Sequence, residues 1–352
     1  MKIKKVFLFI VILINTFCLS SCDDYLDIHE MCFVASMGFD YNIETNEYHM
    51  YLYILNNLNV TNSQNIPMDP EVLGFIAEGY GNTINDSFEM LKNNSDLVID
   101  LHHIKTLILH ESFFVNKNLH KLFDILRYSL HFDPTFEIYV TDSPLKNVYS
   151  IQNMSEVTSF YTLLTGVKQG SQFKTATYYD LCNDLLIENY SGMCPLITVV
   201  NDVFSKEKEN YPTLAHTGYA ILNDNLDINI LKLKQIPEIV FAFPISDYTI
   251  ELDKTVISIN HYKVRKKLKN NTLTLTIIGE MKILRELTYD EEWDSKIKNF
   301  FDEKILKLKQ VCDTNDIDVF NINYLAYQKR IKPKKDYYKN IKIETKYIIN
   351  TY

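Results

Sequence analysis

The segment from residue 104 to residue 140 constrains the fold most, because it joins two strand patterns through one helix pattern. Ile104 to Leu109 and Phe136 to Val140 are compact apolar runs typical of buried strands. This order, strand then helix then strand, predicts a β-α-β unit. The helix pattern between the strands consists of apolar residues at helical spacing, namely Leu119, Leu122, Phe123, Leu126 and Leu130.

Shorter patterns predict further strands and helices on either side of this unit. Cys32 to Met37 and Tyr48 to Leu55 favour strands, since both are rich in apolar and aromatic residues. Thr83, with an acid three residues later, begins a short amphipathic helix in the manner of a capping box. Two later stretches, Met154 to Leu164 and Thr177 to Glu188, again favour helices.

The pattern changes to strands near residue 191, where Gly192 and Pro195 interrupt the chain and indicate a domain boundary. A sheet with one buried face and one long helix is an α+β arrangement. We therefore predict a multi-domain α+β fold of mixed sheets and packed helices, divided into residues 22–190 and 191–352. The elements predicted after the boundary are strands at 216–222, 248–252, 255–259 and 272–278, a helix from Trp293 to Cys312, and a final strand from Ile341 to Tyr347.

The composition is that of an ordinary globular protein with an acidic balance. The net charge is −9 at pH 7 over 352 residues, so nucleic acid is not an expected partner. The cysteines in the body of the chain, Cys32, Cys182, Cys194 and Cys312, are too sparse for a disulfide scaffold. Cys182 and Cys194 either form a bridge after export or remain buried thiols.

The first residues carry an export signal. Basic residues precede an apolar run from Val6 to Phe17, which is the order of a secretory signal peptide. The run is shorter than the about 20 apolar residues that a membrane-spanning helix needs. Leu19-Ser20-Ser21-Cys22 follows and is similar to a lipobox, so we predict that residues 1–21 are cleaved and Cys22 is acylated. Two or more acyl chains, such as palmitate, on Cys22 would anchor the protein to the outer face of a membrane.

No catalytic, cofactor-binding or metal-binding residue is predicted. His102, His103 and His110 are close in sequence, but a strand between them would place His103 and His110 at far ends and on opposite faces. Cys32 lies in an apolar run with no base nearby in the sequence, so we expect it in the core. The motifs of serine hydrolases, P-loop proteins, zinc proteases and dinucleotide-binding proteins do not occur.

Two basic runs stand out in this acidic chain. Clustered lysines attract anionic lipid headgroups by about 1 kcal/mol each near a membrane surface. The alternative is a solvated hairpin tip and a solvated loop, which we favour because charge runs are usually solvated surfaces. The first run comprises Lys263, Arg265, Lys266, Lys267 and Lys269, and the second extends from Lys329 to Lys335.

Several segments, taken in order, resemble the Ger(x)C family of lipoproteins, which are the C-subunits of spore germination receptors. Cys22-Asp23-Asp24 leads through an acidic stretch to Gly38-Phe39-Asp40, which is similar to the Gly-Ile-Asp end of a family strand. Two departures are Tyr25, near where the family usually has tryptophan, and residues 231–237, which replace a segment rich in glycine and glutamate. Further similar segments are Ala77 to Ile84, His103 to Ile108, Asp124 to Arg127, Gly218 to Leu222 and Gln310 to Phe320.

The resemblance implies a three-domain α+β protein without catalytic activity, with two subdomains in residues 22–190. It also implies integral-membrane A and B receptor subunits as partners, on the outer face of the cytoplasmic membrane, which is the spore inner membrane. Cys22 is the functional residue in this interpretation. A solute-binding lipoprotein that delivers a small ligand to a membrane transporter is the alternative, and an exported hydrolase is a more distant one.

Overall fold

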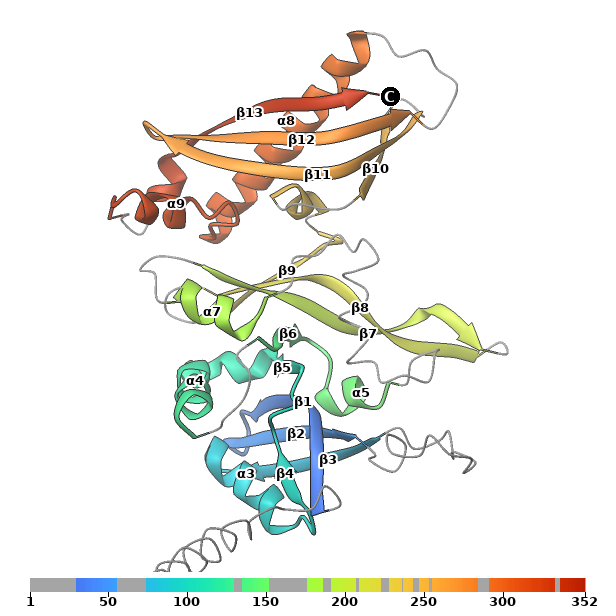
Figure 1. Cartoon of the computed structure of the whole chain (residues 1–352), viewed down its shortest axis with the longest axis vertical. Helices are drawn as coiled ribbons and strands as arrows, with labels where there is room; N and C mark the ends of the chain where they lie inside the picture. The colour runs from blue at the N-terminus through green and yellow to red at the C-terminus, as the bar shows by residue number, and fades with distance from the viewer. Residues whose placement is uncertain are drawn as a thin grey trace, which may run out of the picture.

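The structure is a computed structural model that shows an α+β fold with two mixed sheets, as the sequence predicts. The helices and strands are arranged in three parts along one long axis (Figure 1). Residues 31–151 lie at one end, residues 192–232 in the middle and residues 247–351 at the other end. No helix in the described part is long and apolar enough to cross a membrane. The described residues are 30–55, 74–129, 135–151, 176–185, 191–206, 209–222, 228–235, 237–242, 247–252, 255–283, 291–332 and 336–351.

A nine-stranded sheet runs through the first two of these three parts of the described chain. Its strands are β1 (Met31–Asn42), β2 (Glu47–Leu55), β3 (Gly74–Gly81), β4 (Val98–Asp100), β5 (Thr106–His110), β6 (Glu137–Thr141), β7 (Gly192–Lys206), β8 (Glu209–Leu222) and β9 (Ile228–Lys232). Their order is β3-β2-β1-β5-β6-β7-β8-β9, and β4 pairs with β1 beside this path. The central strands β1, β5, β6 and β7 are parallel, whereas the strands toward both edges pair antiparallel.

The predicted β-α-β unit is confirmed. Strands β5 and β6 are parallel, with Leu107 opposite Ile138. They are connected by a short 3-10 helix, η2 (Glu111–Lys117), and by α4 (Asn118–Ser129). Leu119 and Leu122 of the predicted apolar stripe are fully buried, so α4 packs this stripe onto the sheet.

Helices cover both faces of the parallel strands. On one face, α3 (Ile84–Asn93), α4 and α7 (Tyr178–Leu185) share a core with the strands. On the other face, α5 (Leu145–Tyr149) packs against β1 at Gly38, where a Cβ atom would lie 2.8 Å from the ring of Tyr149. Burial on both faces explains why these strands are continuous apolar runs rather than alternating ones.

A glycine lets α3 lie directly against β3. The predicted capping box is present, because the hydroxyl of Thr83 accepts from the Asp86 N–H and the Asp86 carboxylate accepts from the Thr83 N–H, each at 3.0 Å. A Cβ atom at Gly79 would lie 2.2 Å from the backbone oxygen of Ser87. Because neither backbone can give way easily, any side chain at this position would push α3 off the strand.

The C-terminal part is a four-stranded sheet backed by a long helix. Its strands, in sheet order, are β10 (Asp247–Leu252), β11 (Thr255–Lys269), β12 (Thr272–Ile283) and β13 (Lys342–Thr351). The predicted long helix is α8 (Glu291–Asn315), in which Ile297 and Phe301 pack in one core with Leu273 and Leu275 of β12. Three shorter helices, η3 (Pro237–Ala242), α9 (Ile322–Gln328) and η4 (Tyr337–Asn340), add side chains to the same core.

The nine-stranded sheet continues across residue 191. Strand β7 begins at Gly192 and pairs in parallel with β6, so the change of pattern there marks a change in strand pairing within one sheet. The division into residues 22–190 and 191–352 stays a prediction. The helix predicted from Met154 to Leu164 lies outside the described residues. The four body cysteines are thiols, with Cys194 buried in β7 and Cys182 part-buried in α7.

We expect Gly79→Ala to lower the free energy of unfolding by about 1–3 kcal/mol, because the added methyl group would overlap the Ser87 carbonyl. Urea unfolding followed by circular dichroism measures this loss. The control is Ile76→Ala at a position 40% exposed on the same strand, which should cost less. An unchanged unfolding midpoint for Gly79→Ala would contradict the close contact between α3 and β3.

Candidate functional site

Cys22, the one residue with a predicted chemical role, lies outside the described residues, which begin at Glu30. Its acylation therefore stays a prediction. Among the described residues, a linked group of polar side chains at the ends of the parallel strands is the candidate site.

Polar side chains gather where three neighbouring parallel strands end. The register pairs Phe39 of β1 with Leu109 of β5, and Asp40 and His110 are the next residues on these strands. His110 in turn lies opposite Thr141 of β6, which Asp142 follows. The carboxyl ends of parallel strands are the usual place for ligand sites in α/β sheets, which makes this group a candidate site. We call it the polar edge, and it comprises Asp40, His110, Ser112, Asp142, Thr198 and Lys232.

Asp40, His110 and Ser112 form one half of the polar edge. The Nδ1 atom of His110 lies 3.1 Å from Oδ1 of Asp40 and 2.9 Å from Oγ of Ser112, and Ser112 donates to Asp40. Burial alone would raise the pKa of Asp40, but hydrogen bonds from His110 and Ser112 outweigh it and lower that pKa. Burial likewise would lower the pKa of His110, but Asp40 and the nearby acids raise it. The pair therefore favours carboxylate and imidazolium.

This geometry indicates that the three side chains have a structural role and do not form a catalytic triad. In a Ser-His-Asp catalytic triad, one ring nitrogen of the histidine bonds the serine and the other bonds the carboxylate. Here the same nitrogen, Nδ1 of His110, faces both Ser112 and Asp40. The imidazole therefore does not stand between them as a base would. The three side chains instead tie the turn after β5 to the end of β1.

Asp142 forms the other half of the polar edge. Its carboxylate accepts from the hydroxyl of Thr198 on β7 at 2.7 Å and from the ammonium of Lys232 on β9 at 2.7 Å. Burial works to raise the pKa of Asp142, but the bonds from Lys232 and Thr198 lower it overall. Thr198 also shares a 2.6 Å hydrogen bond with Thr217 of β8. Asp142 thus links the end of β6 to the three strands that follow it.

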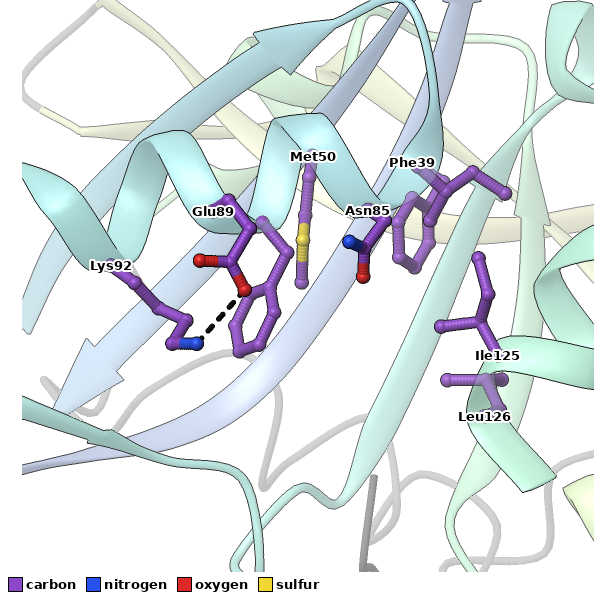
Figure 2. A pocket seen from close by; sticks show the side chains of 9 residues that line it. Phe39, Met50, Asn85, Glu89, Lys92, Ile125 and Leu126 are labelled. Carbon is purple, nitrogen blue, oxygen red and sulfur yellow. Dashed lines mark hydrogen bonds and ion pairs between the residues drawn. The ribbon is translucent and has the colours of Figure 1, made fainter. Parts of the chain in front are cut away.

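A small pocket opens between α3 and α4 over β1 and β2 (Figure 2). Its volume is about 140 Å³, below the roughly 300–1,000 Å³ of typical ligand sites. Glu89 and Lys92 on its α3 side pair with each other at 2.9 Å, so their charges are already satisfied. The remaining lining is Phe39, Met50, Ile84, Asn85, Phe88, Ile125 and Leu126.

The segments that carry the family resemblance have structural roles in the N-terminal part. Gly38 admits α5, and Gly79 admits α3, because a Cβ atom at either position would overlap a packed helix. Asp40 belongs to the polar edge. Glu78 accepts a hydrogen bond from the Tyr51 hydroxyl at 2.8 Å, which joins β3 to β2. These segments therefore specify how helices pack on the sheet.

The histidines and Cys32 lie where the sequence predicts. His102 and His103 face Asp100 in the turn before β5, whereas His110 lies at the other end of that strand. No group of three potential metal ligands occurs among the residues that the structure describes. Cys32 is buried in β1, and burial raises the pKa of its thiol, so the predicted core position is confirmed.

Sequence analysis missed Asp142 and Lys232. One signal could have indicated Asp142, because Asp40, His110 and Asp142 each stand at the end of an apolar strand, and ends of parallel strands meet. Lys232 stands 90 residues after Asp142, and no local pattern connects the two. Only the long-range order of the strands brings them together.

Comparison with known proteins gives three results. A family model described as the spore germination protein N-terminal domain matches residues 24–199. No curated protein sequence matches the chain. Among solved structures, the crystal structure of the GerBC protein is similar at 11% sequence identity and a TM-score of 0.45, covering 90% of this chain and 96% of that one. The structural likeness is a distant one.

We expect His110→Gln to remove a pH-dependent part of the stability. Because the pKa of His110 is raised, its contribution is complete below the unfolded value of about 6.5 and disappears as pH rises through the folded value. Because the pKa of Asp40 is lowered, its contribution is present above about 3.9 and disappears at lower pH. The loss should therefore be largest between about pH 4 and pH 6.5.

Urea unfolding of the variant and the parent at a series of pH values measures this difference. The matched control is His120→Gln, since His120 is exposed on α4. A loss of stability in His110→Gln that does not change with pH would contradict the ion pair with Asp40.

Proposed function

The chain belongs to the family of spore germination proteins, and on that premise we propose that it is the lipid-anchored C-subunit of a nutrient germinant receptor. In this proposal the protein is not a catalyst and acts together with integral-membrane A and B subunits. It stands on the outer face of the cytoplasmic membrane, which becomes the spore inner membrane. Its lipid on Cys22 holds it beside those subunits.

The observation that carries the proposal is the position of the family match relative to the lipobox. The match begins at residue 24, two residues after Cys22, so the family domain starts close to where acylation would create the mature N-terminus. Two acyl chains are enough for stable anchoring, whereas one gives only marginal binding. A domain that begins at its own anchor is held close to the membrane surface.

The polar edge supports the non-catalytic part of the proposal. Its carboxylates, imidazole and ammonium already bond one another, and the bonds connect strands of the sheet. Such a group contributes to rigidity rather than to proton transfer. The surfaces around it would then serve to contact partner subunits.

The alternative, a solute-binding lipoprotein, needs a cleft between two similar lobes. The pocket of about 140 Å³ lies between two helices of the N-terminal part instead. A larger groove of about 770 Å³ lies along α8 and β13, within the C-terminal part, and is lined mainly by charged side chains. Neither hollow lies between two lobes, so the receptor subunit is the better supported function.

We expect Cys22→Ala to abolish incorporation of labelled palmitate, to move the protein from the membrane fraction to the soluble fraction, and to impair germination in response to nutrients. The physical reason is the loss of all acyl chains, which leaves no hydrophobic anchor after cleavage of the signal. The matched control is Cys18→Ala, because Cys18 lies within the predicted signal and should be dispensable.

Two outcomes would count against the proposal. A soluble Cys22→Ala protein in spores that germinate normally would remove the role of the anchor. A rise in the thermal midpoint of the purified protein upon addition of a nutrient would instead favour solute binding, since a ligand stabilises the state that binds it.

A further inference from the structure

Lys329, the first residue of the second basic run, lies at the end of β11, which the first basic run forms. The first run forms the end of β11, and the second begins directly after α9. The ammonium of Lys329 donates to the backbone carbonyl of Leu268, and the N–H of Lys342 donates to the carbonyl of Asn271 at 3.1 Å. Charges that are about 60 residues apart along the chain therefore lie together on the surface.

A bulge in β11 determines which way its lysines point. The pairing with β12 shifts between Asn260 and Lys263, where His261 has a positive φ of 54°. After this bulge Tyr262 and Leu268 are buried, and the odd-numbered basic residues are exposed. Side chains alternate along a strand, so the bulge switches the buried positions of β11 from odd-numbered residues such as Ile259 to even-numbered residues such as Leu268, and the odd-numbered basic residues after it face outward.

Register aligns these cations across three strands. The register places Arg265, Lys267 and Lys269 of β11 opposite Thr276, Thr274 and Thr272 of β12, and these threonines opposite Lys346, Glu344 and Lys342 of β13. Lys263 lies opposite Ile278, which in turn lies opposite Ile348. Cations on β11 and β13 thus lie about 9.6 Å apart, which is two strand spacings. We call this surface the basic face, and it comprises Lys263, Arg265, Lys267, Lys269, Thr272, Thr274, Thr276, Lys342, Glu344 and Lys346.

The charges of the basic face are largely uncompensated. Six of its side chains are cationic and one is a carboxylate, Glu344, which pairs with Lys342 at 2.9 Å. No carboxylate among the described residues forms an ion pair with the other five cations. Neighbours along a strand lie about 7 Å apart, within a Debye length, so they repel one another. A chain with net charge −9 thus concentrates positive charge on one sheet face.

We propose that the basic face rests on the anionic headgroups of the membrane. This inference deepens the proposed function and rests on it, because the lipid on Cys22 supplies the nearby membrane. The face is a flat array of flexible lysines and threonines, which suits a surface of diffuse negative charge. The aromatic hot spots of a protein-binding surface are absent from this face, and its apolar residues, Ile278 and the 53% exposed Ile348, lie at the edge opposite Lys263.

The direction in which the basic face points determines how the molecule would lie on the membrane. Strands β10 to β13 are stacked along the long axis, so the broad faces of their sheet look sideways from it (Figure 1). The N-terminal strands lie at the other end of that axis (Figure 1). Lipid attached to the chain ahead of β1 and a basic face in the C-terminal part would together hold the protein along the membrane instead of upright on it.

Vesicle flotation tests the proposal with the mature chain from residue 22 carrying Cys22→Ala, so that no acyl group contributes. The probes are vesicles of phosphatidylglycerol and phosphatidylcholine in equal amounts, and vesicles of phosphatidylcholine alone. We expect binding to the first only, weakening as salt is added. The triple variant Arg265→Gln, Lys267→Gln, Lys269→Gln should bind about 100-fold more weakly, from about fivefold per cation.

Two comparison variants separate charge from fold. Lys105→Gln, Lys146→Gln, Lys234→Gln removes the same charge from exposed positions elsewhere and should bind like the parent. Lys267→Arg, Lys269→Arg keeps the charge of the face and should also bind like the parent.

Three results would overturn the proposal. They are no binding to phosphatidylglycerol, equal losses in the two glutamine triples, or binding to soluble polyglutamate without binding to vesicles, which would assign the face to an acidic protein. Because the tested chain has no acyl group, a failure of acylation at Cys22 would leave these results unchanged.

Discussion

Two residue pairs join the N-terminal strands of the large sheet to its middle strands. Val140 and Thr141 of β6 lie opposite Leu196 and Ile197 of β7, and this short parallel contact makes one sheet of the first nine described strands. Only two pairs form there, so the bonds from Asp142 to Thr198 and Lys232 add cross-links at the same point. The strands that follow depend on this junction for their position relative to β1 and β5.

Beyond the junction, the alternation of one strand joins two cores. In β8, Tyr219 and Ile221 point into the core that α8 covers, whereas Ala220 and Leu222 point into the core of the N-terminal part. A strand with period two can serve two cores only if both of its faces are buried. The middle strands therefore separate the two cores and contribute side chains to both. A shift of their register by one residue would turn the side chains of each core toward the other core.

Local patterns predicted much of the fold, and long-range pairing explains the rest. The capping box at Thr83, the buried stripe at Leu119 and Leu122, and the long helix α8 follow from residues a few positions apart. Strands β3 and β9 were not predicted, and neither was the passage of the sheet across residue 191. In the candidate site, the pairing of Asp142 with Lys232 depends on strand order, which no short segment encodes.

The bulge at His261 also bears on how such a protein can change over evolutionary time. Substitutions can add or remove single charges on the β11 surface, but they leave the direction of every other side chain as it was. Losing His261 would remove the bulge and leave a regular strand in which Tyr262 still faces α8 and Lys263 still faces outward, because Asn260 and Lys263 would keep their partners Glu280 and Ile278. A deletion at this point is therefore less disruptive than one elsewhere in the strand, where the loss of one residue would turn every following side chain to the other face.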